Sequence, residues 1–215
     1  MAPNGQDHLI GDEAALRDRY RPASKAVLEK SRPKIDPKAA GFIAASPFVV
    51  LATTSDSGTD ASPRGGPPGF VKVLDEHHLA FGDLSGNNRL DSYANVVTHD
   101  RVGLLFLVPN VGETLRVNGR ARVTTDPAVL ERTQIDDGRT PKVALVVEVD
   151  ECFIHCAKAL RRSSLWEPGT WAPAGSSPSA AEVITDQFQL DIDPKVIETD
   201  LEADYEATLW EQGGR

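Results

Sequence analysis

The sequence predicts a mainly β fold in which short strands form an antiparallel barrel. Six or so apolar or alternating segments follow one another between residues 48 and 156, and turn-forming residues separate several of them. The helices expected between these strands are short. Hairpin-type links join antiparallel strands, whereas a doubly wound parallel sheet needs a helical crossover between its strands. The pattern therefore favours the barrel.

Helices are expected before the first strand. Residues 12–30 have apolar side chains at helical spacing, and Pro22 should divide them into two pieces. A further short helix should follow Asp36, a good N-cap, with Pro37 at its first position. This helix should end before Pro47, because the residue preceding a proline disfavours helical backbone angles.

The expected strands differ in the side chains that they present. Residues 48–54 and 100–109 are apolar runs typical of buried strands. Residues 112–126 alternate, so that Leu115, Val117 and Ala121 should face one way and polar side chains the other. The remaining strands are expected on both sides of a Gly/Pro-rich break in residues 59–75, at 79–83 and at 141–156, and short helices at 90–96 and 126–134.

The C-terminal part differs from the strand region in composition and is expected to form a loop and a helix. Residues 167–180 are rich in Pro, Gly and Ser and predict a loop. Residues 193–210 predict an amphipathic helix, because apolar side chains recur every four residues. We therefore expect three parts: an N-terminal helical extension (1–40), the barrel (41–166), and a loop with an acidic C-terminal helix (167–215).

Charge and composition limit the function. The 215 residues carry a formal net charge of -9, which argues against a nucleic-acid partner bound through its phosphates. Residues 191–215 hold eight acids and two bases, a net of -6, so the remaining chain carries only -3. An acidic protein with a few well-placed arginines suits a small anionic ligand better than a polyanion.

The cellular location is predicted from the features that the sequence does not show, namely a membrane span, a secretory signal and a disulfide framework. It has no run of about 18 consecutive apolar residues, so we expect neither a membrane span nor a membrane partner. The N-terminus does not resemble a secretory signal. Two cysteines, Cys152 and Cys156, are too few for a disulfide scaffold. We expect a reduced, cytoplasmic protein.

Two stretches could bind a phosphate. In SPRG, Arg64 is followed by Gly65 and Gly66, which can place a cation beside free backbone N–H groups. In GDLSGNNR, Asn88 and Arg89 precede a helix whose N-terminus favours an anion. The alternatives are a hairpin with an exposed arginine and an asparagine N-cap with a solvated arginine. Residues 85–87 are expected to shape the turn rather than to touch a ligand.

Two further segments carry polar side chains. The strand face with Thr114, Arg116, Asn118 and Arg120 is either solvated or lines a pocket. Lys158, Arg161, Arg162 and Trp166 either clamp an anionic, aromatic ligand or form a solvated basic helix with a packed tryptophan.

The cysteine and histidine side chains are weaker candidates. A zinc site at residues 152–156 is disfavoured, because no second Cys/His pair lies at ligand spacing and three ligands on one strand are geometrically awkward. A Cys-His nucleophile is disfavoured, because neighbouring residues of a strand face opposite sides. His77, His78 and His99 are expected at the surface.

Several motifs in one order resemble the pyridoxamine 5'-phosphate oxidase-like family of flavin-binding split barrels. The resemblance spans roughly residues 40–166 and is carried by FVVLATTSDSGTDASPRG, LAFGDLSGNNRLDSYANVVTHDRVGLLFLVP and GETLRVNGRARV. It looks closest to a bacterial subgroup marked by SPRG, GNNR, GETLRVNGRA and HCAKALRRSxLW. It implies a six-stranded antiparallel split β-barrel that forms a homodimer, with FMN in a groove between the subunits.

The resemblance also implies roles for individual residues. Arg64 would contact FMN, and Asn88 and Arg89 would hold its phosphate. Thr114 would lie near the isoalloxazine ring, with Arg116 beside it on the same face. The C-terminal segment of a partner subunit would reach the flavin. The implied cofactor-binding set is Arg64, Gly65, Asn88, Arg89, Thr114, Arg116, Lys158, Arg161, Ser163 and Trp166.

The activity implied is that of an FMN-dependent oxidoreductase acting on a small molecule by hydride or electron transfer at flavin N5. No catalytic side chain and no metal is expected. The strand after Arg64 lacks the family motif Arg-x-Val-Leu-Leu-Lys, and the chain ends in an acidic helix, so oxidation of pyridoxamine phosphate itself is not expected. The alternatives are a non-catalytic flavin-binding dimer, a sensor or partner-binding module, and a relative that uses F420 or haem, with His155 as the haem ligand.

Overall fold

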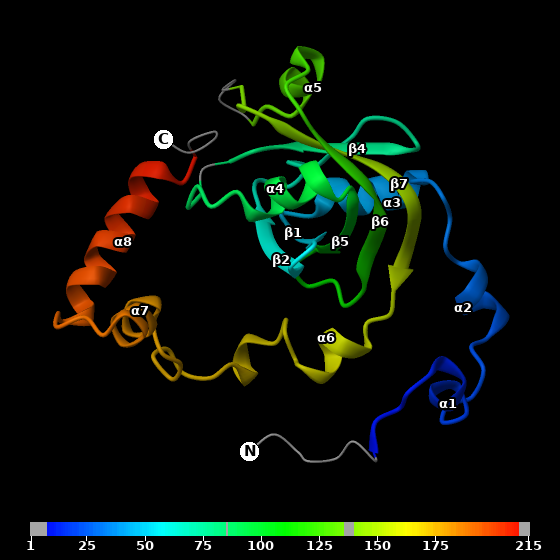
Figure 1. Ribbon diagram of the computed structural model, residues 1–215, viewed down its shortest axis with the longest axis horizontal. Coiled ribbons are helices and arrows are strands. Elements are labelled where there is room, and N and C mark those ends of the chain that lie inside the picture. The colour runs from blue at the N-terminus through cyan, green and yellow to red at the C-terminus, as the bar shows by residue number, and fades with distance from the viewer. Residues whose placement is uncertain (1–7, 85, 136–139, 211–215) are drawn as a thin grey trace. The chain divides into compact units, whose positions relative to one another are not determined.

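The computed structural model of the chain describes residues 8–84, 86–135 and 140–210 (Figure 1). The chain divides into two units, residues 1–31 and 32–215. The first unit contains the short helices α1 (Glu13–Arg17) and α2 (Lys25–Glu29). The break between them at Pro22 is confirmed.

The second unit is built on one antiparallel sheet. Within the described residues its strands are β1 (Phe48–Ser55), β2 (Gly58–Gly65), β3 (Lys72–Val73), β4 (His78–Gly82), β5 (Arg101–Leu107), β6 (Thr114–Thr124) and β7 (Ala144–His155). Their order across the sheet is β2-β1-β5-β6-β7-β4-β3, and all paired neighbours run antiparallel. The mainly β antiparallel fold is confirmed (Figure 1).

The strand count is seven rather than the six expected. Extended structure was expected on both sides of the Gly/Pro-rich break, and on its far side the chain forms β3, a strand of only two residues that pairs with β4 at the sheet edge. The Gly/Pro-rich stretch after Gly65 interrupts the chain and separates β3 from β2. As an edge strand β2 tolerates Pro63, and it ends at Gly65, before Pro67 and Pro68.

The core forms on the inner face of this sheet. The alternation predicted for β6 is confirmed, because Leu115, Val117 and Ala121 are at most 3% exposed. Val49 and Leu51 of β1 face the same core. A β-bulge at residues 118–119 interrupts the pairing of β6 with β7, and a Cβ at Gly119 would collide with the carbonyl oxygen of Glu148.

The helices of this unit follow local sequence signals. In α3 (Pro37–Ala45) the Asp36 carboxylate accepts the N–H groups of Lys38 and Ala39, as predicted for an N-cap, and α3 ends before Pro47. The other helices are α4 (Asp91–Thr98), α5 (Pro127–Arg132), α6 (Lys158–Arg162), the 3₁₀ turn η2 (Pro168–Thr170), α7 (Ala180–Phe188) and α8 (Pro194–Thr208).

The C-terminal helices were predicted in part. The expected helix at residues 193–210 is α8, with Asp193 as its N-cap. The helix α7 was not predicted. Its signal is a capping box in which Ser179 and Glu182 each bond the other's backbone N–H. Residues 211–215 of the expected C-terminal part lie outside the described residues.

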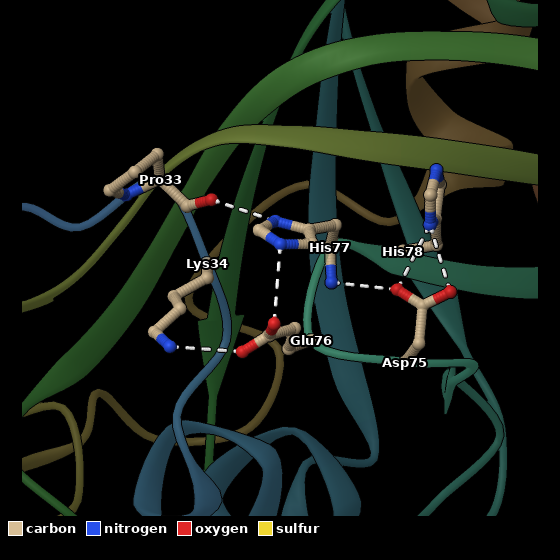
Figure 2. Close-up of polar contacts among 6 residues, drawn as sticks. All are labelled: Pro33, Lys34, Asp75, Glu76, His77 and His78. Atoms are coloured by element: carbon tan, nitrogen blue, oxygen red, sulfur yellow. Dashed lines mark hydrogen bonds and ion pairs between the residues drawn. The ribbon is translucent and has the colours of Figure 1, made fainter.

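The turn before β4, residues 75–77, forms polar contacts with residues 33–34 at the start of the second unit (Figure 2). The Glu76 carboxylate bonds Lys34 Nζ at 2.9 Å, and His77 Nδ1 lies 3.1 Å from the carbonyl oxygen of Pro33. Asp75 accepts the His77 N–H and contacts the His78 ring. These contacts lower the pKa of Asp75 and that of Glu76.

No helix in the described ranges is both long and apolar enough to cross a membrane.

Candidate functional site

A pocket of about 310 Å³ lies where β2, the segment after β4 and the start of α4 meet. It is lined by residues 60–64, 83–84 and 86–93, and we call it the Arg64 pocket. Three predicted phosphate ligands, Arg64, Asn88 and Arg89, are brought together here. The two phosphate-binding stretches of the sequence therefore form one site, although 23 intervening residues separate Arg64 from Asn88 in the chain.

Two residues that line this pocket carry buried polar atoms without a hydrogen-bond partner in the described part of the chain. Arg64 Nε and Tyr93 Oη are both buried and have no hydrogen-bond partner among the described residues. The Arg64 guanidinium carbon lies 5.2 Å from the centroid of the Tyr93 ring, a cation–π contact that fixes the two side chains together. Because unpaired buried donors are costly, this arrangement is suited to a ligand that supplies acceptors.

The loop before α4 is held in an unusual backbone conformation. Asn88 and Leu90 have φ values of 56° and 58°, in the left-handed region. Asparagine tolerates this region, whereas for leucine it is unfavourable by about 1–2 kcal/mol. The Asn87 side chain accepts the Arg89 N–H at 3.1 Å, so Asn87 shapes the turn as predicted, and it also lines the Arg64 pocket. Ser85 lies outside the described residues.

The helix α4 presents an uncapped N-terminus to the pocket. Its N-cap is Leu90, which forms no side-chain hydrogen bond, so the alternative of an asparagine N-cap is wrong. The first N–H groups of such a helix and its dipole favour an anion. The helix is anchored to β2, because Ser92 Oγ lies 2.8 Å from Ser62 Oγ and donates to Asp60 Oδ2 at 2.9 Å.

Arg89 is exposed and already paired. Its Nε donates to Asp91 Oδ2 at 2.8 Å, and 72% of its side chain is accessible. Arg89 can therefore reach a ligand only by exchanging or sharing Asp91. Arg64, half-buried and without a carboxylate contact within ion-pair distance among the described residues, is the stronger fixed cation of the two.

Asp83 brings a buried carboxyl group into the same pocket. It is 8% exposed, and burial raises its pKa, while the Tyr93 hydroxyl and the charges of Arg64 and Lys142 oppose the rise. Burial and the Asp83 carboxyl also raise the pKa of Tyr93. The Tyr93 hydroxyl thus lies close enough to Asp83 to interact with it, although the two do not meet hydrogen-bond geometry.

A second pocket of about 440 Å³ lies on the outer face of β1, β5 and β6. We call it the Thr114 pocket. Its walls are mainly apolar and include Val50, Leu105 and Leu160, while Thr114 and Arg116 supply polar groups. Thr114 is 6% exposed. The Arg64 and Thr114 pockets share no lining residue.

Arg116 is held by an aromatic contact. Its guanidinium carbon lies 5.0 Å from the centroid of the Phe153 ring, and it forms no ion pair within the described part of the chain. Arg116 can therefore face an anionic or electron-rich group in the Thr114 pocket without breaking an existing salt bridge.

The remaining predicted residues lie elsewhere. Gly65 lines a small cavity of about 100 Å³ together with Arg64. Lys158 and Arg161 are exposed residues of α6, and the Ser163 hydroxyl donates to the Leu160 carbonyl. Trp166 Nε1 donates to the Val111 carbonyl of the same chain at 2.9 Å. These four side chains, Lys158, Arg161, Ser163 and Trp166, line neither the Arg64 pocket nor the Thr114 pocket.

His155 and Cys156 both line the Thr114 pocket, which the alternation argument did not foresee. The strand β7 ends at His155, so Cys156 is free of the pleat and can turn to the same side. Cys156 is exposed, whereas Cys152 is buried and burial raises its pKa to about 11. Among the described residues no group of His, Cys, Asp and Glu is arranged to hold a metal. His77 is exposed, and His78 and His99 are half-buried.

Asp83 and Tyr93 are the site residues that the sequence reasoning missed. A signal for each existed. Asp83 directly follows the apolar strand β4 at the strand end that faces the motif GNNR, and Tyr93 lies one helical turn before Val96 on the buried face of α4.

Comparison with known proteins places this geometry in a family context. The family model described as Pyridoxamine 5'-phosphate oxidase matches residues 35–156. A search of curated proteins finds no match.

Similar solved structures include HupZ from Group A Streptococcus, at 17% identity, with a TM-score of 0.46 over 56% of this chain and 93% of that one. A Lactobacillus delbrueckii protein described as a candidate pyridoxamine 5'-phosphate oxidase is 20% identical, with a TM-score of 0.43 over 57% and 95% of the two chains. An FMN-binding protein from Syntrophomonas wolfei is 13% identical, with a TM-score of 0.44 over 54% and 83%.

Proposed function

We propose, from the premise that this chain belongs to the pyridoxamine 5'-phosphate oxidase family, that it is an FMN-dependent oxidoreductase acting on a small molecule. The observation that carries the proposal is the Arg64 pocket. Two arginines, an asparagine and a free helix N-terminus converge there, as a phosphate group requires.

The residues present fit the phosphate end of FMN. Arg64 Nε is a buried donor without a partner among the described residues, and Tyr93 Oη is a second such polar atom in the same pocket. A phosphate supplies several strong acceptor oxygens, which would satisfy Arg64 Nε and the N-terminal N–H groups of α4. Arg64 and Arg89 would balance its charge, and Asn88 would add polar contacts from the loop.

The proposal includes a homodimer with one FMN at each of two equivalent sites. The residues that the resemblance assigns to the phosphate and to the ring lie in pockets without a common lining residue. A second copy can bring its Thr114 pocket to the Arg64 pocket of the first. The half-exposed apolar side chains Val50, Leu105 and Leu107 on the outer face would then be buried.

When bound, FMN would supply the redox chemistry, since hydride and electron transfer are properties of the flavin ring. The protein's own side chains bind and orient. Thr114, a largely buried residue of the Thr114 pocket, offers a hydroxyl suited to a polar edge of the ring. Arg116 offers a positive charge that would stabilise a ring carrying extra electron density. The apolar walls of the Thr114 pocket would exclude water.

The visible spectrum of the purified chain, before and after incubation with FMN, tests the proposal. We expect flavin absorbance to stay with the protein through gel filtration, and bound flavin to be bleached by NADH or NADPH and restored by an acceptor. Bound flavin that no donor reduces would favour the non-catalytic flavin-binding dimer. A protein that retains no flavin would refute the proposal, and a Soret band would identify haem, not FMN, as the cofactor.

A further inference from the structure

A buried carboxyl group in a phosphate pocket needs an explanation. Asp83 is 8% exposed and lines the Arg64 pocket, where its negative charge would repel a phosphate. Its position is fixed, because its N–H donates to the Val143 carbonyl at 2.9 Å and so continues the pairing of β4 with β7. The chain therefore places this carboxyl group in the pocket through its sheet and not through a mobile loop.

The other two acids of the pocket are already engaged. Asp60 accepts the Ser92 hydroxyl at 2.9 Å, and Asp91 accepts Arg89 Nε at 2.8 Å. Both therefore have a structural partner that explains them. Asp83 has the Tyr93 hydroxyl beside it, but the two do not meet hydrogen-bond geometry. Arg64 and Lys142 act on Asp83 through their charges.

Asp83 and Tyr93 together match the hydrogen-bonding needs of an alcohol. A ligand hydroxyl has one hydrogen to donate and lone pairs that accept. The Asp83 carboxylate accepts, and the Tyr93 hydroxyl, which is buried and unpaired among the described residues, can donate. A ligand hydroxyl between them would accept from Tyr93 and donate to Asp83, whereas an alkyl chain would leave the Tyr93 hydroxyl buried and unsatisfied, at a cost to binding.

We propose that Asp83 and Tyr93 recognise a hydroxyl group next to the phosphate of the ligand, so that the Arg64 pocket selects polyol phosphates over simple alkyl phosphates and inorganic phosphate. The inference rests on the proposed function, since the ribityl phosphate of FMN is such a group. In the Arg64 pocket, Arg64 provides affinity for the phosphate and Asp83 provides selectivity for the neighbouring hydroxyl. The repulsion between Asp83 and inorganic phosphate then adds to the preference for polyol phosphates.

Isothermal titration calorimetry of the full chain with ribitol 5-phosphate, pentyl phosphate and inorganic phosphate tests this. We expect wild type to bind ribitol 5-phosphate at least about tenfold more tightly than pentyl phosphate, because a site built to bond a hydroxyl rejects the analogue that lacks it. Asp83→Leu should abolish this ratio, and Tyr93→Phe, which keeps the ring, should reduce it. Asp150→Leu, which changes an outer carboxylate away from both pockets, should leave it unchanged.

The outcomes separate this inference from the proposed function. Equal binding of ribitol 5-phosphate and pentyl phosphate by wild type overturns the role of Asp83, even if FMN binds. An unchanged ratio in both Asp83→Leu and Tyr93→Phe does the same. If FMN does not bind but the tenfold ratio holds and depends on Asp83, the polyol phosphate site stands and the flavin function falls. Because Asp83→Leu could fail to fold, circular dichroism of each variant accompanies the titrations, and Tyr93→Phe alone can decide.

Discussion

The two arginines of the Arg64 pocket should contribute very differently to FMN affinity. Arg64 is half-buried, with its Nε fully enclosed and unpaired among the described residues, whereas 72% of the Arg89 side chain is exposed and its Nε is engaged by Asp91. Replacing each arginine by alanine compares the contribution to FMN binding of Arg64, which is desolvated before the ligand binds, with that of Arg89, which must first leave its ion pair with Asp91.

The magnitudes follow from these environments. A buried hydrogen bond to a charged group contributes about 1.5–3 kcal/mol, so Arg64→Ala should weaken FMN binding about 10- to 100-fold. An exposed ion pair is worth about 0.2–1 kcal/mol, and Arg89 must exchange Asp91 to make one, so Arg89→Ala should cost about fivefold at most. Arg120→Ala is the control, because Arg120 pairs with Glu148 and Asp150 on the outer face.

Quenching of FMN fluorescence on titration with each variant measures the dissociation constants. Arg64→Lys should lie between wild type and Arg64→Ala, since it keeps the charge but loses the planar donor fork. If Arg89→Ala weakens binding as much as Arg64→Ala or more, the reasoning from burial is wrong. If neither variant differs from Arg120→Ala, neither arginine holds the phosphate.

Three further predictions concern pH, assembly and folding. The folded-state pKa of Asp83 lies above its ordinary value of 3.8, so ionisation of Asp83 lowers the free energy of unfolding above the raised pKa and has no effect below 3.8. In urea unfolding, wild type should therefore gain stability relative to Asp83→Asn as the pH falls from the raised pKa to 3.8. A stability difference that does not change with pH contradicts the raised pKa. Leu105→Lys, which places a charge on the half-exposed apolar face, should convert a dimer to a monomer in light scattering, and a dimer of unchanged stability would remove this face from the interface. Gly119→Ala should lower the urea midpoint more than Gly41→Ala, because a Cβ at residue 119 meets the Glu148 carbonyl oxygen while one at residue 41 meets nothing within 4 Å; equal midpoints would contradict it.

The fold was predictable where one local rule sufficed. The alternation of β6 placed Leu115 and Val117 in the core, and Asp36 with Pro37 located the start of α3. The number of strands was not predictable in this way. The strand β3 lies beyond the Gly/Pro-rich break, where extended structure was expected, but its two residues are too few to show a periodicity of their own.

The candidate site was predictable in its cations but not in its buried acid and phenol. SPRG and GNNR each carry a phosphate signature, and the fold brings Arg64 and Arg89 into one pocket. Asp83 was only the last residue of the strand expected at 79–83, because burial of a carboxyl group is decided by side chains far away in sequence. His155 and Cys156 were separated by a rule for strand interiors that does not hold at the end of β7.

The strained loop before α4 links these observations. A leucine at φ 58° is unfavourable, and the protein retains it at the position that begins α4 and follows Arg89. With Asn88 also left-handed, the chain turns sharply on both sides of Arg89, so that Arg89 and the α4 N-terminus line the same pocket as Arg64. Leu90→Gly should relieve the strain without moving a charge. Stability should then rise or stay level, while FMN affinity falls, because a flexible glycine no longer fixes the turn that presents Arg89. If Leu90→Gly lowers stability and leaves FMN affinity unchanged, the left-handed leucine serves packing rather than the site.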